Sequence, residues 1–305
     1  MNENGQLVQY GTDPSDYSTD VLATFARNFV AIAPESFLLY FAPFAPHFPP
    51  ISAQRHEGEL AALELPEAPS YREADVSDKP PYIRARKRAL EGGDGDPFTK
   101  AWSLWVKTLE RRAELETLLA VDEAVASILD ALSQRESEQR TVVIYTSDNG
   151  RLRGEHWSYG KNDPYEESVR VPLVMVYPGE ITPGTTSDAV VANIDLAPTI
   201  ADLSGVAIPA SVEGVSLRPL FRKGARLERR EILLEWWGGG HPLLAPMFHA
   251  LRADGWKFVL YDDGFEELYD LRADPYELDN LAVLEPTQPK LKELRALLKS
   301  RAPLT

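Results

Sequence analysis

The chain of 305 residues contains no cysteine, which excludes disulfide bonds and structural metal sites built from thiolates. Long hydrophobic runs are missing too, because no apolar stretch approaches the roughly 20 residues that a membrane-spanning helix needs. The amino terminus also lacks the basic-then-apolar pattern of a secretory signal peptide. We therefore expect a soluble protein with no signal peptide in this chain and no membrane partner, and its compartment stays open.

Positive charge is scarce as well. The sequence has 32 lysine and arginine residues against 47 aspartate and glutamate residues, and its net charge is -15 at pH 7. This balance argues against nucleic acid as a partner, because binding to a phosphate backbone depends on lysine and arginine. An anionic ligand of another kind would be repelled by the mean field, so the residues that recognise it must form a local site.

The most informative stretch begins with the apolar, β-branched run Thr141–Thr146, which is typical of a buried central strand in a parallel sheet. The run ends in Ser-Asp-Asn-Gly, which puts Asp148 and Asn149 at the carboxyl end of the strand, where open α/β sheets bind ligands. Their carboxylate and amide oxygens suit Ca²⁺ or Mg²⁺. Beyond a loop, the ammonium group of Lys161 could reach back toward a sulfate or phosphate oxygen. By itself, Asp-Asn-Gly is also a common turn.

Further motifs follow this stretch in a fixed order and extend over nearly the whole chain. They are Gly154-Glu155-His156, Gly160-Lys161, Tyr165–Glu167 and Arg170–Leu173 in the centre, Tyr10–Leu22 and Phe37–Pro49 near the start, and Val191–Ile200, Gly214–Leu220 and Tyr269–Leu281 downstream. In this order they resemble the sulfatase family. Within that family the resemblance is to the N-acetylglucosamine-6-sulfatase type.

The resemblance implies an α/β fold of the alkaline-phosphatase superfamily, in which helices sandwich a mixed or parallel sheet. We expect that domain at residues 1–225, without its amino-terminal strands, and a small antiparallel α+β subdomain at 226–305. Hydrophobic periodicity agrees with this division. It predicts helices from about Ser18, from Asp96 through Leu132, over Ile194–Leu203 and from about Gln288, and strands at Phe37–Phe41, Glu231–Trp236, Phe248–Arg252, Lys257–Tyr261 and Glu267–Leu271.

The resemblance also assigns roles to individual residues. Asp148 and Asn149 would be metal ligands for Ca²⁺ or Mg²⁺, and Lys161 would bind a sulfate oxygen and act in catalysis. His47, in the Ala-Pro-His-Phe-Pro loop, would contact the sulfate or protonate the leaving alcohol. His156 would orient the loop or touch the sugar, or else cap local backbone. Arg170 is expected to form a structural ion pair with Glu166 or Glu167.

The family's nucleophile is missing from these residues. Sulfatases use a formylglycine cofactor made from Cys or Ser inside Cys/Ser-x-Pro-x-Arg, and the chain has neither a Cys nor a Ser in that context. The Asp-Asp pair that supplies the first metal ligands is absent too, and Asp262-Asp263-Gly264 is expected to be a hairpin turn instead. The isolated chain should therefore be inactive, and a complementing amino-terminal polypeptide or a homo-oligomer is the expected protein partner.

Three functions follow from these observations. The first is a sulfuric ester hydrolase that acts on a sulfated carbohydrate in its intact form. The second is a non-catalytic remnant that binds a divalent cation and a sulfated glycan. The third is a phosphodiesterase-like hydrolase of the same superfamily with a metal-activated water, although none of the five histidines stands in a His-x-x-x-His or Asp-x-His pattern.

Overall fold

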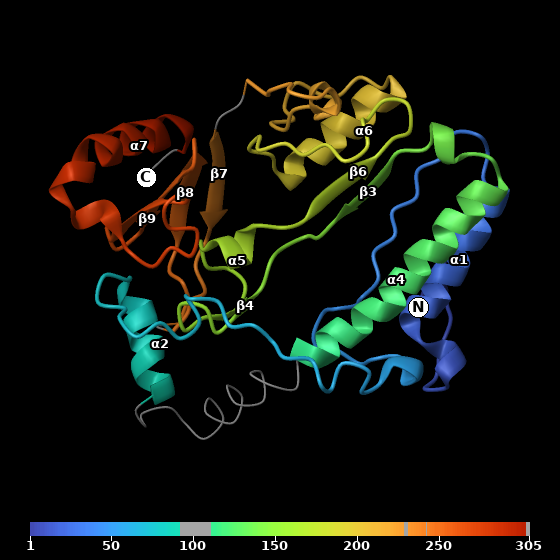
Figure 1. Ribbon diagram of the computed structural model, residues 1–305, viewed down its shortest axis with the longest axis horizontal. Helices are drawn as coiled ribbons and strands as arrows, with labels where there is room; N and C mark the ends of the chain where they lie inside the picture. The colour runs from blue at the N-terminus through green and yellow to red at the C-terminus, as the bar shows by residue number, and fades with distance from the viewer. Residues whose placement is uncertain (92–110, 229–230, 242, 303–305) are drawn as a thin grey trace. The chain divides into compact units, whose positions relative to one another are not determined.

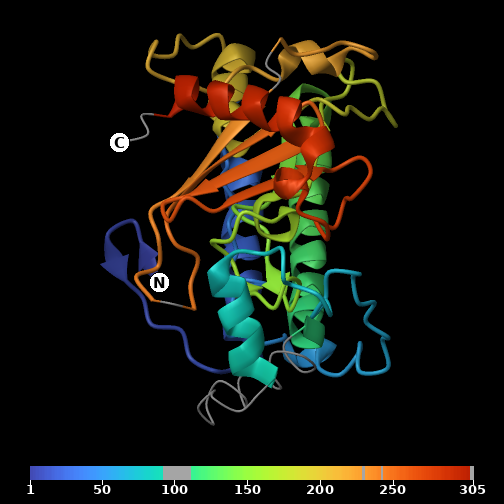
Figure 2. The same cartoon turned by 90° about the vertical axis from the view of Figure 1, so that its left-hand side faces the viewer.

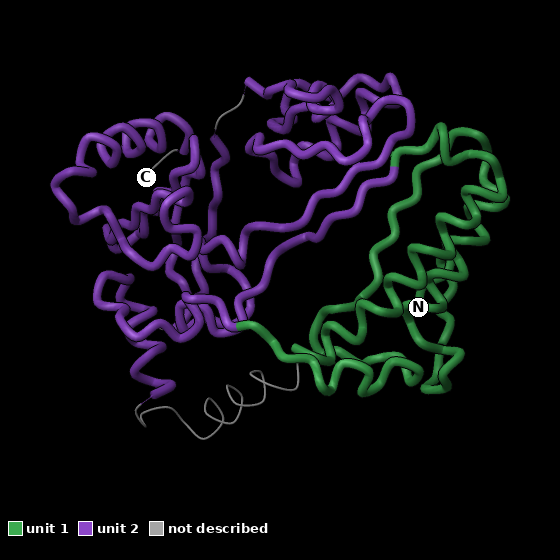
Figure 3. The backbone as a smooth tube through the Cα atoms, viewed as in Figure 1, with its two compact units in different colours: residues 1–66, 100–142 green, residues 67–99, 143–305 purple. Residues whose placement is uncertain are grey.

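The structure, a computed structural model, describes residues 1–91, 111–228, 231–241 and 243–302. The chain divides into two compact units, one formed by Met1–Pro66 and Lys100–Val142 and the other by Glu67–Thr99 and Val143–Thr305 (Figure 3). The expected boundary between residues 225 and 226 stays a prediction.

The first unit is built on two helices that lie side by side, α1 (Ser18–Ile32) and α4 (Arg111–Gln134) (Figure 1). Small side chains dominate the buried face and let the helices approach closely. The buried residues are Val21, Ala23, Ala26 and Val30 on α1 and Ala120, Val121 and Ala124 on α4. Hydrophobic spacing in the sequence predicts that this helix buries Phe25 and Phe29 together with Val21 and Leu22, and this is wrong for the two phenylalanines. Both remain exposed because the alanine-lined face packs against α4 instead.

The predicted strand Phe37–Phe41 does not form. The segment is extended, and its side chains alternate between half-buried and exposed, with Leu38 69% and Tyr40 87% exposed. Among the described residues no neighbouring strand pairs with it, and a strand requires ladder hydrogen bonds as well as an extended backbone. Local patterning indicates an extended apolar segment here, but it cannot show whether a partner strand is present.

In the second unit, β3 (Val143–Thr146) pairs with β6 (Leu173–Val176). The pairing is antiparallel, with Val143 opposite Val176 and Thr146 opposite Leu173, so the interpretation of Thr141–Thr146 as a strand of a parallel sheet is wrong for this pair. Chain direction between two distant strands depends on the path of the connection and not on their composition. A short hairpin, β4 (Leu152–Arg153) and β5 (Tyr159–Gly160), fills part of that connection.

The carboxyl-terminal part of this unit is a four-stranded antiparallel sheet of β7 (Glu231–Trp236), β8 (Phe248–Ala253), β9 (Trp256–Tyr261) and β10 (Glu266–Asp270), as predicted. Helix α7 (Gln288–Arg301) lies across one face (Figure 2), where leucines of the helix and sheet form an apolar core. The opposite face packs against α2 (Pro81–Glu91) and the β4–β5 hairpin through Ile83, Leu152, Trp157 and Tyr165. The sheet is therefore a rigid support for that hairpin.

The Asp262–Gly264 segment forms the β9–β10 hairpin turn, as predicted, with Gly264 at φ +83°. The helix predicted at Ile194–Leu203 is α6 (Leu196–Ser204), ended by Gly205 in the left-handed conformation. The expected start of the long helix at Asp96 lies outside the described residues. The remaining elements are β1 (Asn2–Glu3), β2 (Gln6–Leu7), α5 (Glu166–Val169) and the 3₁₀ helices Pro14–Asp16, Gln54–His56, Glu138–Arg140, Asn193–Asp195, Arg218–Phe221, Leu281–Val283 and Glu285–Thr287. None of the described helices combines the length and apolar character needed to cross a bilayer.

Candidate active site

The loop that follows β3 is held in place by its own backbone. Ser147 Oγ donates to the carbonyl oxygen of Asn149 at 2.9 Å, and the Gly150 N–H donates to the carbonyl oxygen of Ser168 in α5 at 2.9 Å. A Cβ atom at Gly150 would lie 2.2 Å from the carbonyl oxygen of Glu167, so only glycine allows the loop to approach α5 this closely. The position of Asn149 is therefore fixed by packing of the loop on α5.

Lys161 returns to this loop from the end of the β4–β5 hairpin. Its Nζ donates to Asn149 Oδ1 at 2.7 Å, while Asp148 and Lys161 are both exposed. The accessible loop after β3 thus offers the Asn149 amide oxygen and the carboxylate of the adjacent Asp148, and the Lys161 ammonium group contacts it from the hairpin. These are donors for an anion and ligands for a hard cation, and the metal, substrate and catalytic roles of these residues stay predictions.

The hairpin between these loops is anchored on the segment before α2. Gly154 faces the ring of Tyr71 so closely that a Cβ there would lie 2.4 Å from a ring atom. Arg72 donates to the hydroxyl oxygen of Tyr159 from Nε and Nη2, at 3.2 and 2.9 Å. Lys161 therefore projects from a hairpin that is fixed on both of its strands.

His156, at the turn of the hairpin, is completely buried. Its ring is stacked on Tyr165 with centroids 3.9 Å apart, and its Nδ1 lies 2.9 Å from Glu73 Oε1. The geometry therefore supports neither contact with a sugar nor capping of local backbone, and the ring instead joins the hairpin to Glu73 and Tyr165. Sequence reasoning missed Glu73 because nothing local marks it as a partner of a residue so distant in the chain.

His47 lies in the first compact unit, in an exposed loop with cis peptide bonds at Ala45-Pro46 and Phe48-Pro49. Its Nδ1 is 2.8 Å from the Phe48 carbonyl oxygen, and its ring is 5.0 Å from the Phe44 ring between centroids. The free edge of the imidazole faces solvent within that unit. The structure brings Asn149 and Lys161 together, whereas His47 belongs to the other unit, and its role stays a prediction.

Within the part of the chain that the structure describes, Arg170 forms no ion pair with Glu166 or Glu167, and Glu166 pairs with two other cations. Glu166 Oε1 lies 2.9 Å from Lys257 Nζ and 3.5 Å from Arg252 Nε, while Arg170 is exposed. Burial is the largest single influence and would raise the pKa of Glu166, but the contact with Lys257 and the positive charges of Arg252 and Arg170 together lower it. Lys257 stands between Trp256 and Phe258 in β9, and a lysine inside an apolar strand was the sequence signal for this buried pair.

Family profiles match almost the whole chain. The profile described as Sulfatase matches residues 2–206, and the one described as N-sulphoglucosamine sulphohydrolase, C-terminal, matches residues 154–302. This chain belongs to the sulfatase family. The resemblance seen in the motifs is thereby confirmed.

Individual relatives agree. The N-acetylglucosamine-6-O-sulfatase of Bacteroides thetaiotaomicron is 33% identical over 231 residues, which cover 74% of this chain and 41% of that protein. The human N-acetylglucosamine-6-sulfatase is 29% identical over 322 residues, covering 92% and 56%, and human arylsulfatase K is 36% identical over 177 residues, covering 54% and 32%. The sulfatase chain described here thus spans about half the length of the curated relatives it matches.

Solved structures confirm the predicted fold class. The structure of BT4656 in complex with its substrate D-glucosamine-2-N,6-O-disulfate has a TM-score of 0.84 and 25% identity, covering 98% of this chain and 71% of that one. The phosphonate monoester hydrolase of Silicibacter pomeroyi has a TM-score of 0.71 and 24% identity, covering 94% and 60%, and shows likeness of fold alone. The sulfatase fold therefore accounts for both the mixed α/β region and the carboxyl-terminal antiparallel sheet.

Proposed function

We propose that this chain carries the cation- and sulfate-binding part of a sulfuric ester hydrolase that acts on a sulfated carbohydrate. The observation that carries the proposal is the 2.7 Å hydrogen bond from Lys161 Nζ to Asn149 Oδ1 beside the exposed Asp148. Two kinds of similar protein support the substrate class. The bacterial and bovine relatives are named as sulfatases of N-acetylglucosamine 6-sulfate, and one similar solved structure contains a disulfated glucosamine as its substrate.

The donor atoms on this loop fit a hard divalent cation, Ca²⁺ or Mg²⁺. Asp148 offers an exposed carboxylate, and the amide oxygen of Asn149 has two lone pairs, so it can accept from Lys161 and still ligate a cation. Ca²⁺ takes 6–8 oxygen ligands, so the sulfate, water and other residues would complete the shell. When bound, the cation would polarise the sulfate group.

Lys161 supplies the second positive charge. Its hydrogen bond to Asn149 orients the ammonium group before a ligand arrives, and a sulfate oxygen placed at the loop would take over one of its three N–H donors. This contact offsets negative charge that develops as the S–O bond breaks. His47 would contact the bridging oxygen as a cation or protonate the leaving alcohol, a contribution of typically 10²–10⁴-fold for general acid catalysis.

The attacking group is the missing part. The 305 residues contain no Cys and no Ser in a Ser-x-Pro-x-Arg context, so a formylglycine hydrate must come from outside them. We therefore expect the isolated chain to bind sulfated sugar without hydrolysing it. A complementing polypeptide that contains the nucleophile would convert this binding part into a hydrolase.

Ligand-observed NMR with N-acetylglucosamine 6-sulfate, in the presence of CaCl₂, tests the proposal. We expect binding to the purified chain, no binding of unsulfated N-acetylglucosamine, and at least tenfold weaker binding to Lys161→Ala. Lys223→Ala, which changes an exposed lysine far along the sequence from the loop, is the matched control and should bind as the wild type does. Equal binding of both sugars, or an unchanged Lys161→Ala, would contradict the proposal.

The absence of the nucleophile gives the non-catalytic binding function its own support. Sulfate release from a fluorogenic 6-sulfated N-acetylglucosaminide, measured on the same protein, distinguishes this binding function from the hydrolase. No release by the chain alone is the expected result for both functions. Release after addition of a formylglycine-containing sulfatase fragment would support the hydrolase, and release by the chain alone that Lys161→Ala abolishes would overturn the expected inactivity.

A further inference from the structure

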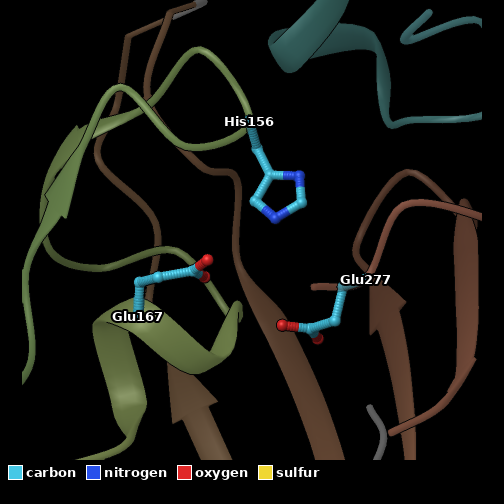
Figure 4. Close-up of side chains that lie close together, drawn as sticks. All are labelled: His156, Glu167 and Glu277. Atoms are coloured by element: carbon cyan, nitrogen blue, oxygen red, sulfur yellow. The ribbon is translucent and has the colours of Figure 1, made fainter. Parts of the chain in front are cut away.

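A second polar cluster lies inside the same unit as the Asn149–Lys161 pair. Only one of its three members, a histidine, is among the site residues expected from the sequence. His156, Glu167 and Glu277 come from the hairpin turn, from α5 and from the segment after β10, and their side chains converge (Figure 4). One ligand atom of each lies within 4.8 Å of the other two. His156 and Glu277 are completely buried, so this convergence is internal and differs from an exposed acidic cluster.

The imidazole of His156 has one nitrogen in use and one directed into the cluster. Its Nδ1 lies 2.9 Å from Glu73 Oε1, whereas the buried Nε2 has no hydrogen-bond partner among the described residues. Burial lowers the pKa of His156 to about 4, so the ring is neutral at pH 7. In the tautomer in which Nδ1 carries the ring proton and donates it to Glu73, the Nε2 lone pair faces the two carboxylates.

This combination is the one found around metal-binding histidines, which bond a carboxylate or carbonyl through the ring nitrogen that does not bind the metal. A buried polar atom without a partner is uncommon in folded proteins and indicates a missing ion or water.

The carboxylates offer oxygens of the matching kind. Glu167 Oε1 accepts from Ser70 Oγ at 3.0 Å, but the buried Glu167 Oε2 has no hydrogen-bond partner in the part of the chain that the structure describes. Glu277 Oε2 accepts from the Glu166 N–H at 2.7 Å, and its Oε1 lies 2.7 Å from Lys257 Nζ. Each carboxylate therefore keeps at least one lone pair for a cation.

Lys257 does not supply the charge that Glu167 needs. Its Nζ donates to the Pro164 carbonyl oxygen at 2.9 Å and forms ion pairs with Glu166 Oε1 at 2.9 Å and Glu277 Oε1 at 2.7 Å, so its charge is already shared between two other carboxylates. Burial raises the pKa of Glu167, and the charge of Lys257 offsets this only in part.

We propose that His156 Nε2 and the carboxylates of Glu167 and Glu277 bind one Zn²⁺ ion. Zn²⁺ takes nitrogen and carboxylate oxygen at about 2.0–2.2 Å, which places neighbouring ligands of a tetrahedron about 3.4 Å apart. The ligand atoms, now within 4.8 Å of one another, would draw together around the ion. The imidazole favours Zn²⁺ over Ca²⁺ or Mg²⁺, so this site is chemically distinct from the Asp148–Asn149 loop.

The ion would be structural, because its position lies between three segments of the unit. Glu167 belongs to α5, whose backbone contacts Gly150 and whose Ser168 carbonyl oxygen accepts from the Gly150 N–H at 2.9 Å. His156 belongs to the hairpin that carries Lys161. One ion would thus join the loop of Asn149, the hairpin of Lys161 and the segment of Glu277 after the carboxyl-terminal sheet.

Zinc binding to the full chain, first stripped with a chelator, tests the proposal. We expect one Zn²⁺ per chain by calorimetry, a rise in Tm, and an absorption band of a nitrogen- and oxygen-coordinated ion when Co²⁺ replaces Zn²⁺. His156→Gln and Glu277→Gln should each weaken zinc binding at least 100-fold. Glu73→Gln, which changes only the partner of Nδ1, should weaken it about tenfold.

His249→Gln is the matched control, because His249 Nδ1 also lies 3.0 Å from a carboxylate, Glu235 Oε1, but outside the cluster. It should bind zinc as the wild type does. Equal zinc affinity in the wild type and His156→Gln would assign the ion to another place and overturn the proposal, as would the absence of binding by the wild type. If His156→Gln fails to fold, a Co²⁺ complex of the wild type without a histidine nitrogen ligand in pulsed electron paramagnetic resonance would overturn it too.

Discussion

The exposed Asn149–Lys161 pair and the buried His156–Glu167–Glu277 cluster use similar chemical groups in opposite surroundings. At the surface, the Lys161 ammonium has water as an alternative to Asn149, so a ligand can replace either partner at little cost. In the interior, each charge needs a partner at all times, because an uncompensated buried charge costs several kcal/mol. The first region is therefore suited to exchange ligands, and the second to hold the fold together.

The largest expected effect comes from breaking the buried charges at Lys257. Lys257→Met removes the ammonium group from Glu166 and Glu277 and leaves two carboxylates without it, so we expect the free energy of unfolding to fall by about 3–5 kcal/mol. Urea denaturation measures the change. Lys290→Met, at an exposed pair with Glu293, is the control and should cost about 0–1 kcal/mol. Equal costs for the two variants would remove the distinction between the regions.

A smaller loss is expected at the contact that joins the regions. Gly150→Ala places a Cβ 2.2 Å from the Glu167 carbonyl oxygen, so loop and helix must separate. We expect a loss of about 1–3 kcal/mol, as for other overpacked sites, and weaker Ca²⁺ binding in calorimetry. Gly11→Ala meets only the flexible carboxylate of Asp16, at 3.0 Å, and should leave both properties unchanged. Unaltered Ca²⁺ binding in Gly150→Ala would show that the cation site does not depend on the contact between the loop and α5.

The pH dependence of stability sharpens the contrast further. Glu267 is buried and accepts hydrogen bonds from Tyr165, Tyr261 and Tyr269, and burial raises its pKa above the ordinary value of 4.5. The stabilisation that the protonated Glu267 gives to the folded state is therefore fully present below pH 4.5. It is lost as pH rises through the raised pKa of Glu267 in the folded state.

Glu267→Gln has no proton to lose, so its stability should fall less with rising pH than that of the wild type, although the lost hydrogen bonds cost about 1 kcal/mol at low pH. Thermal melts between pH 4 and 9 check this. Glu266→Gln, on the neighbouring residue paired with Arg295, is the control. Parallel pH profiles for the wild type and Glu267→Gln would show that Glu267 does not titrate in this range.

The smallest effect on stability should come from Lys161→Ala. The residue is exposed and its hydrogen bond to Asn149 has water as a substitute, so the free energy of unfolding should change by no more than about 0.5 kcal/mol. Urea denaturation of the variant, set beside its sugar binding, measures the contrast directly. A loss above 2 kcal/mol would mean that Lys161 supports the fold and would weaken the division between the two regions.

Local patterns predicted what depends on near neighbours in sequence. The four carboxyl-terminal strands and the Asp262–Gly264 turn follow from alternation and turn chemistry, and both are found. The same patterns could not predict the direction of the β3–β6 pair, nor the missing partner of Phe37–Phe41, because both depend on segments far away in the chain. Fold class came from the family resemblance, which carries such long-range information.

The site shows the same limit. The motif order predicted that Lys161 would return to the end of β3, and the structure places it against Asn149. The motifs drew attention to His156, but they could not predict its surroundings, because Glu73 precedes it and Glu277 follows it by long stretches of sequence. Burial, which decides between a ligand contact and an internal role, is a property of the assembled unit.

The β3–β6 ribbon has a consequence for anyone who prepares this protein. Among the described residues it pairs with no further strand, and Tyr145, Val174 and Val176 are about half exposed, at 47%, 56% and 50%. Open strand edges with apolar side chains favour pairing between copies. Yield should therefore depend on protein concentration, and dilute, cold expression with a solubility tag should recover more monodisperse material than concentrated refolding.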